Sequence, residues 1–262
     1  MDLQLENRLA LVTGSTAGIG FAIAEALAAE GARVIVNGRT QKGVDEAVAA
    51  LKRTGKTVLG FAGDLSTAIA AETVVNAYPG IEILVNNLGI FEATPFEKIP
   101  DDDWRRFFEV NVLSGARLAR LVLPAMRRAN WGRIIFISSE SGIQIPTEMV
   151  HYGMTKAAQI AVARGIAETV AGSGITVNSV LPGPTRSRGV NDFVESLAQD
   201  QGKSPEQFEK EFFAHVRPTS LLKRFATTQE VAAMVAYVAS PLASATTGAA
   251  LRVDGGTVKS AF

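Results

Sequence analysis

The sequence contains no cysteine, and it has only two histidines among its 262 residues. The absence of cysteine excludes disulfide bonds, thiolate metal sites and cysteine nucleophiles. In addition, no cluster of His, Asp and Glu residues has the spacing of metal ligands. We therefore expect no metal site, and any redox chemistry of this protein requires a bound cofactor.

The chain also has no excess of either charge. Lys and Arg together number 26, as do Asp and Glu, and no long run of like charge appears. This balance argues against nucleic acid or an anionic membrane surface as the main partner and favours a small molecule. No segment approaches the roughly 18 apolar residues of a membrane span, so we expect a soluble cytoplasmic protein with no membrane partner.

What the sequence does contain is a regular alternation of short strand patterns and longer helix patterns. Hydrophobic residues make up 47% of the chain, and the strand patterns are apolar runs rich in β-branched residues: LALVTG, RVIVNG, TVLGFAGD, EILVNN, RIIFISS, ITVNSVLPG and ALRVDGG. Such runs separated by helices predict a parallel sheet covered by helices on both faces. No linker or repeat divides the chain, so we expect one doubly wound α/β domain over residues 1–262.

One stretch, residues 185–225, interrupts this alternation after the sixth strand pattern. Ser204 as N-cap, Pro205 at the first helical position and Gln207 in a capping box predict a helix within it. We therefore expect a helical insertion that serves as a substrate-binding lid. Its apolar residues are interpreted as packing it onto the body of the protein: Phe193, Leu197, Phe208 and Phe212.

Three glycines, Gly14, Gly18 and Gly20, follow the first strand pattern in TGSTAGIG. Glycine there permits a tight turn, close approach of the backbone to a pyrophosphate, and close packing of the following helix. The helix N-terminus adds N–H donors and the positive end of its dipole. Because the spacing G-x-x-x-G-x-G differs from the usual G-x-G-x-x-G fingerprint, the glycines alone leave an ordinary strand-to-helix turn open as an alternative.

The end of the second strand pattern indicates which dinucleotide this turn would bind. NAD sites place Asp or Glu about 20 residues beyond the glycines, whereas NADP sites favour a cation. Gly38 and Arg39 occupy that neighbourhood here. We predict that Arg39 binds the 2′-phosphate through charge-assisted hydrogen bonds, which favours NADP(H) over NAD(H). The alternative is a solvated arginine at a strand end.

Tyr152 and Lys156 stand four residues apart in HYGMTK, one turn along a helix. A free tyrosine has a pKa of about 10, too high for efficient proton exchange near neutrality. A lysine on the same helix face, together with an oxidised nicotinamide, would favour tyrosinate and lower that pKa. Adjacent helix positions do not share a face, so we interpret His151 as a residue behind the site or on the surface, and we expect His215 on the surface of the insertion.

Taken together, TGSTAGIG, NNLG, Asn111, ISS, YGMTK and LPGPT resemble the short-chain dehydrogenase/reductase family in order and spacing from about Leu5 to Gly256. The resemblance implies a single Rossmann-like domain with a seven-stranded parallel sheet in the order 3-2-1-4-5-6-7. It also implies NAD(P)-dependent chemistry on CH–OH and C=O groups, and a homotetramer, with a dimer as the alternative.

The resemblance assigns catalytic roles by position. Ser139 lies thirteen residues before Tyr152 and takes the role of the active-site serine, which Ser138 does not. It would hydrogen-bond the substrate oxygen, while Tyr152 gives that oxygen its proton and Lys156 tunes the tyrosine. Asn111 matches the asparagine that completes the proton relay of the family.

For the cofactor, the resemblance assigns positions at the carboxyl edge of the sheet. Asp64 matches the acid near the adenine, and Pro182, Gly183 and Thr185 match the turn that faces the nicotinamide. The full expected set of cofactor-binding residues is Gly14, Ser15, Thr16, Gly18, Ile19, Gly20, Arg39, Asp64, Leu65, Asn86, Gly89, Tyr152, Lys156, Pro182, Gly183 and Thr185.

We therefore expect an NADP(H)-dependent oxidoreductase that transfers hydride between the nicotinamide and a carbonyl or secondary alcohol of a small molecule. A 3-oxoacyl-thioester reductase that acts on an acyl carrier remains an alternative, as does a dinucleotide-binding sensor without turnover. The complete catalytic set argues against the sensor, since a mere binder has no need of it. If Arg186 and Arg188 face the pocket, they suit a substrate that carries carboxylate or phosphate.

Overall fold

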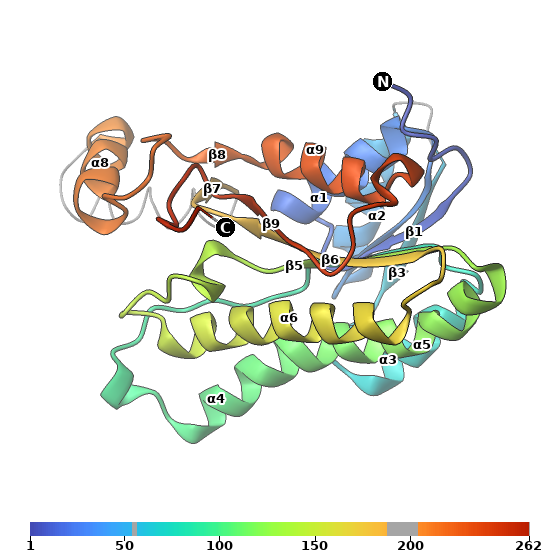
Figure 1. Cartoon of the computed structure of the whole chain (residues 1–262), viewed down its shortest axis with the longest axis horizontal. Helices are drawn as coiled ribbons and strands as arrows, with labels where there is room; N and C mark the ends of the chain where they lie inside the picture. The colour runs from blue at the N-terminus through green and yellow to red at the C-terminus, as the bar shows by residue number, and fades with distance from the viewer. Residues whose placement is uncertain (54–56, 188–203, 262) are drawn as a thin grey trace.

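The computed structural model describes residues 1–53, 57–187 and 204–261 of the chain. Seven parallel strands form one sheet in the order β3-β2-β1-β4-β5-β6-β9 (Figure 1). The strands are β1 Leu9–Val12, β2 Arg33–Gly38, β3 Val58–Ala62, β4 Ile83–Asn86, β5 Gly132–Ile137, β6 Ile175–Pro182 and β9 Ala250–Val253. This confirms the expected doubly wound sheet, and the strand expected as the seventh is β9 because two short strands precede it in the chain.

Helices cover both faces of the sheet. All residues of β1, β4, β5 and β6 are buried, as parallel strands require. Each face has its own hydrophobic cluster and its own helices. One face carries α1 (Gly18–Ala29), α2 (Gln41–Lys52) and α9 (Thr228–Ala239), and the other carries α3 (Ala68–Ala77), α5 (Ser114–Ala129) and α6 (Val150–Thr169) (Figure 1).

Several helices begin at capping signals in the sequence. The hydroxyls of Thr40 and Thr67 accept hydrogen bonds from the first turns of α2 and α3. Thr227 and Glu230 form a capping box at the start of α9. In contrast, the N-cap residue of α1, Ala17, supplies no side-chain cap, and the first turn of α1 has no acidic residue. The first N–H groups of α1 are therefore available to an anionic ligand.

A long helical segment joins β4 to β5. It consists of η1 (Phe96–Lys98), α4 (Asp101–Phe108), the π-helical turn η2 (Glu109–Leu113) and α5. Asn111 lies in the π-helical turn. Such turns inside helices are rare and often accompany functional sites, so the structure places this predicted site residue at a backbone irregularity.

The insertion between β6 and α9 begins and ends at the same place. β7 (Thr185–Arg186) pairs in parallel with β8 (Ala226–Thr227), and the N–H of Ala226 donates to the carbonyl of Pro184 at 2.9 Å. Figure 1 shows α8 (Pro205–Glu211) beyond the end of the sheet. The predicted capping box is confirmed, because the side chains of Ser204 and Gln207 each accept from the other residue's N–H.

Aromatic residues hold the insertion together. Phe208, Phe213 and Phe225 form a buried cluster that is separate from the two core clusters, and Phe212 packs against it. The rings therefore pack on one another within the insertion, rather than onto the sheet as expected. The other expected residues of this segment lie outside the described residues: Arg188, Phe193 and Leu197.

Candidate active site

The glycine turn after β1 requires glycine for conformational and steric reasons. Gly14 and Gly18 have positive φ angles of 59° and 60°, which side chains rarely adopt. A Cβ atom on Gly20 would lie 2.5 Å from both the Gly14 carbonyl oxygen and the Asn87 side chain. The turn therefore brings its backbone close to the uncapped start of α1, which suits a pyrophosphate.

Two asparagines that sequence reasoning missed hold this turn. The Oδ1 atom of Asn37 accepts from the N–H of Gly14 at 3.1 Å, and Nδ2 of Asn87 donates to the carbonyls of Thr13 and Gly14 at 2.9 and 3.1 Å. The Ser15 hydroxyl donates to the carbonyl of Val12, so Ser15 shapes the turn from the inside. Both asparagines stand at the end of an otherwise apolar strand pattern, and this was the available sequence signal for a structural role at the turn.

Arg39 lies exposed at the end of β2. In the described part of the chain its guanidinium has no hydrogen-bond or ion-pair partner. A Cβ atom on Gly38 would lie 2.5 Å from Cγ2 of Thr16, so Gly38 makes room for Thr16. Glycine also replaces the Asp or Glu that NAD sites place in this neighbourhood. The arginine is therefore free to bind an anion at this edge of the sheet.

Other expected cofactor residues lie at the same edge, with different exposures. Asp64 is exposed, and its carboxylate accepts from the N–H and hydroxyl of Ser66 at 3.0 and 2.7 Å. The Leu65 side chain is buried in the core, so only its backbone could contact a ligand. The turn after β6 is tight, because a Cβ on Gly183 would lie 2.6 Å from the Asp254 carbonyl oxygen, and the Thr185 hydroxyl donates to the Gly183 carbonyl at 2.8 Å.

The structure brings Ser139, Tyr152 and Lys156 together. Ser139 follows β5, its hydroxyl is near enough to Tyr152 to lower the pKa of that tyrosine, and Nζ of Lys156 lies 5.5 Å from the centre of the Tyr152 ring. The neighbouring Ser138 is turned away, since its hydroxyl donates to the Lys156 carbonyl at 2.7 Å. A Cβ on Gly89 would lie 3.6 Å from Nζ of Lys156, so the loop after β4 passes beside the same group.

Asn111 reaches this cluster indirectly. Its Nδ2 atom donates to the carbonyl of Ile90 and the hydroxyl of Thr155 at 3.0 and 2.9 Å, and its Oδ1 accepts from the N–H of Ile90 at 2.8 Å. The buried side chain of Gln159 connects Asn111 to Lys156. Its Nε2 atom donates to the Asn111 carbonyl at 2.6 Å, and its Oε1 atom accepts from Nζ of Lys156 at 3.1 Å. Sequence reasoning missed Gln159, although it lies one turn beyond Lys156 on the same helix.

Burial opposes ionisation of both catalytic side chains. It raises the pKa of Tyr152, and the nearby carboxylate of Glu140 raises it further, whereas the Ser139 hydroxyl and Arg217 lower it. Burial lowers the pKa of Lys156 to about 7. The expected lowering of the tyrosine pKa is therefore not found in the protein alone, where burial and Glu140 raise that pKa.

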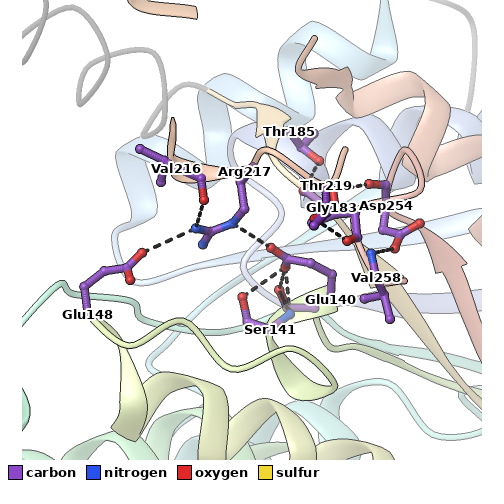
Figure 2. A network of polar contacts seen from close by, with 12 residues as sticks. Glu140, Ser141, Glu148, Gly183, Thr185, Val216, Arg217, Thr219, Asp254 and Val258 are labelled. Carbon is purple, nitrogen blue, oxygen red and sulfur yellow. Dashed lines mark hydrogen bonds and ion pairs between the residues drawn. The ribbon is translucent and has the colours of Figure 1, made fainter. Parts of the chain in front are cut away.

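A polar network beside the cluster was also missed (Figure 2). The buried carboxylate of Glu140 accepts from the Ser139 hydroxyl at 2.5 Å and from the N–H of Ser141 at 2.7 Å. Arg217, from the insertion, donates from Nε to Glu140 and from Nη1 to Glu148, both at 3.4 Å. Figure 2 shows Arg217 between the two carboxylates. An acid directly after the serine was the available sequence signal.

The two histidines and Arg186, the described one of the two arginines expected at the pocket, have no place in the cluster. His151 is fully buried with its ring 4.0 Å from Phe107, which fits a residue behind the site and excludes the surface alternative, while His215 is exposed as expected. Arg186 forms an ion pair with Glu209. In the described part of the chain, no group of His, Asp and Glu could hold a metal. None of the described helices has the length and hydropathy of a membrane span.

Comparisons with known proteins agree with this geometry. A family model described as Enoyl-(Acyl carrier protein) reductase matches residues 14–258. The oxidoreductase YvrD of Bacillus subtilis (strain 168) is 48% identical over 263 residues, which cover 99% of this chain and 100% of that protein. D-beta-hydroxybutyrate dehydrogenase of Cupriavidus necator is 34% identical over 260 residues, covering 97% and 99%.

A solved structure is similar over nearly the whole chain. L-sorbose reductase from Gluconobacter frateurii, complexed with NADPH and L-sorbose, matches with a TM-score of 0.93 and 31% identity, covering 99% of this chain and 100% of that one. The doubly wound sheet and these relatives define the class as nicotinamide-dependent oxidoreductases that act on alcohol or carbonyl groups. Within that class, the chain belongs to the short-chain dehydrogenase/reductase family.

Proposed function

We propose that this protein uses NADP(H) to reduce a carbonyl group of a small molecule or to oxidise the corresponding secondary alcohol, with Tyr152 as the general acid and base. The observation that carries the proposal is the cluster of Ser139, Tyr152 and Lys156 at the carboxyl edge of the sheet. Ligands of doubly wound sheets bind at that edge. The finding that NADPH occupies a solved relative supports the choice of cofactor.

The residues present fit such a cofactor. The uncapped start of α1 and the close backbone of the glycine turn suit a pyrophosphate, and the unpaired Arg39 suits a 2′-phosphate. The turn at Pro182, Gly183 and Thr185 would hold the nicotinamide, and the exposed Asp64 would face the adenine. Gly89 lies beside Lys156 instead, and the side chain of Asn86 is buried. When bound, the cofactor supplies or accepts the hydride.

The chain's own groups then handle the oxygen and its proton. Ser139 hydrogen-bonds the substrate oxygen and orients it toward Tyr152. In reduction the Tyr152 hydroxyl gives its proton to that oxygen, and in oxidation the tyrosinate takes it back. The ammonium of Lys156, held by the Ile137 carbonyl at 2.9 Å and by Gln159, stabilises the tyrosinate.

We propose the insertion, residues 185–225, as the substrate lid. It starts beside the cofactor turn, because a Cβ on Gly18 would lie 3.4 Å from Cβ of Ser187. Across from it, the half-exposed ring of Phe91 lies 6.4 Å from that of Tyr152. These surroundings favour a substrate with an apolar part next to its carbonyl carbon.

Binding and turnover test the proposal together. Fluorescence titration with NADPH and NADH is expected to show tighter binding of NADPH. A panel of ketones, ketoses, 3-oxoacids and 3-oxoacyl thioesters, with NADPH consumption as the readout, is expected to contain at least one substrate. Tyr152→Phe is expected to lower turnover roughly 10²–10⁴-fold and to leave NADPH affinity within about threefold, since it removes one hydroxyl.

The matched control is Tyr237→Phe, which removes a half-exposed hydroxyl in α9 and is expected to leave turnover unchanged. Cofactor binding without turnover of any substrate would support a sensor instead. Full activity of Tyr152→Phe would contradict the assignment of the general acid.

We further propose a homotetramer, with a dimer as the alternative assembly. Exposed apolar side chains on the segment from α4 to α5, including Phe108 and Leu113, support it. Light scattering of the purified protein tests the assembly, and the mass of a single chain would contradict it.

A further inference from the structure

Glu140 is a buried acid next to the catalytic serine that the proposed mechanism does not use. Its side chain is 6% exposed, and its Oε2 atom accepts from the hydroxyls of Ser139 and Ser141 at 2.5 and 3.0 Å. A carboxylate in this position has two effects. It orients the serine hydroxyl, and it places a negative charge beside the hydroxyl of Tyr152, where a second negative charge must form during proton transfer.

The counter-charge comes from the insertion. Arg217 follows the π-helical turn η4 (Phe212–Val216), and its side chain is 14% exposed. Its backbone N–H donates to the Phe212 carbonyl at 2.9 Å, and its guanidinium lies 6.0 Å from the Phe212 ring. Through Phe212 the arginine is attached to the aromatic cluster of the insertion. Its Nε atom reaches Oε1 of Glu140, the oxygen that faces away from Ser139.

We propose that Arg217 is a positioning residue that neutralises Glu140 and thereby favours proton transfer at the Ser139–Tyr152 pair. The inference rests on the proposed role of Tyr152 as general acid and base. With Arg217 in place, Glu140 orients Ser139 without repelling tyrosinate. Without the guanidinium of Arg217, Glu140 would lack its counter-charge and would oppose the charged form of Tyr152.

The charges around Tyr152 come from three elements and have defined signs. Lys156 on α6 and Arg217 on the insertion favour tyrosinate, whereas Glu140 after β5 opposes it. Burial also raises the pKa of Tyr152, and this effect does not depend on the insertion. Glu148 contacts Arg217 but is 45% exposed, so water screens its charge far more than that of Glu140.

Opposite shifts of a pH profile test the proposal. Alcohol oxidation by the holoenzyme needs tyrosinate, so kcat/KM rises with pH through the pKa of Tyr152. Arg217→Gln is expected to move this rise upward by about one pH unit, with roughly tenfold lower activity below it. Glu140→Gln is expected to move it downward, and the double variant is expected to return close to the wild-type position.

Two variants control for structural damage. Arg217→Lys keeps the charge and is expected to keep the wild-type profile. Arg224→Gln removes an insertion arginine that pairs with Glu230 instead, and it is expected to leave the profile unchanged. Equal or absent shifts in Arg217→Gln and Glu140→Gln would overturn the proposal, as would a loss of activity in both at every pH without any shift.

A measurement without turnover separates this inference from the proposed function. The chain has three tyrosines, so the absorbance difference between a protein and its Tyr152→Phe derivative on raising the pH reports Tyr152 alone. Arg217→Gln is expected to move this transition upward in the complex with oxidised cofactor. If wild type shows no turnover but this shift is present, only the proposed function fails. If turnover depends on Tyr152 but neither readout moves, only the inference fails.

Discussion

The two ends of the site are built in different ways. At the glycine turn, backbone groups are held by the buried amides of Asn37 and Asn87 and by strands β1, β2 and β4. At the insertion, the contacts are ion pairs of Arg186, Arg217 and Arg224 together with one small aromatic cluster. The first end has little freedom to change shape. At the second end, the exposed pairs of Arg186 and Arg224 can exchange their partners with water at small cost, whereas the buried Arg217–Glu140 pair cannot. Under the proposed function, cofactor binding would rest on the rigid end and substrate choice on the adjustable one.

The largest expected effect is at the rigid end. Gly20→Ala places a Cβ atom 2.5 Å from the backbone of Gly14 and from Asn87, which is expected to destabilise the protein by about 3 kcal/mol and to weaken cofactor binding. Chemical denaturation and NADPH titration measure both. Gly165→Ala is the control, because a Cβ atom there meets nothing within 4 Å; a gain of roughly 0.5–1 kcal/mol is expected in this helix position. Equal effects of the two variants on stability and NADPH binding would show that the glycine turn is no more rigid than an ordinary helix surface.

Arg39→Ala is expected to have the next largest effect. Loss of charge-assisted hydrogen bonds to the 2′-phosphate is expected to weaken NADPH binding by about 2 kcal/mol, roughly 30-fold, and to leave NADH binding unchanged. Fluorescence titration with both cofactors measures the ratio. A parallel loss for both cofactors would show that Arg39 does not read the 2′-phosphate.

His151 is a buried polar group away from both ends of the site, and its ring nitrogens have no partner among the described residues. Burial lowers the pKa of His151, so the unfolded chain binds a proton before the folded one does as pH falls. Stability is therefore expected to decline below about pH 6.5. His151→Phe is expected to remove that part of the decline and to add about 1 kcal/mol near neutrality. Thermal unfolding between pH 5 and pH 8 measures this, and an unchanged slope would count against it.

The smallest effect is expected at the adjustable end. Arg186→Ala breaks the ion pair with Glu209, in which Arg186 is 48% exposed, and is expected to cost about 0.5 kcal/mol at low salt and less at high salt. Denaturation at two ionic strengths tests it. A loss of unfolding free energy as large as that of Gly20→Ala would contradict the view that the insertion is the more adjustable end.

Local patterns predicted the parts of the protein that depend on local structure. Apolar runs gave the strands, and the Ser204, Pro205 and Gln207 signal gave the start of α8. The spacing of Tyr152 and Lys156 predicted a shared helix face, because helix periodicity fixes which residues are neighbours. The glycine turn was also predictable, since glycine is required there by backbone geometry alone.

The missed features depend on pairs that are distant in the sequence. Glu140 meets Arg217 across 77 positions, and Gln159 meets Asn111 across 48. No periodicity links such residues, so only the folded chain shows that they meet. Whether His151 lies behind the site or on the surface stayed open for the same reason, because its burial depends on how α4 packs against α6.

The pairing of β7 with β8 has a consequence for how this protein can be changed. The chain leaves the body at Thr185 and returns at Ala226, two positions joined as neighbours in one small ladder. A segment whose ends already touch can be exchanged for one of another length with little entropic penalty and no change in the strand order. The insertion is therefore a natural unit for grafting, and chimeras joined at this ladder could acquire new substrates while keeping the original cofactor.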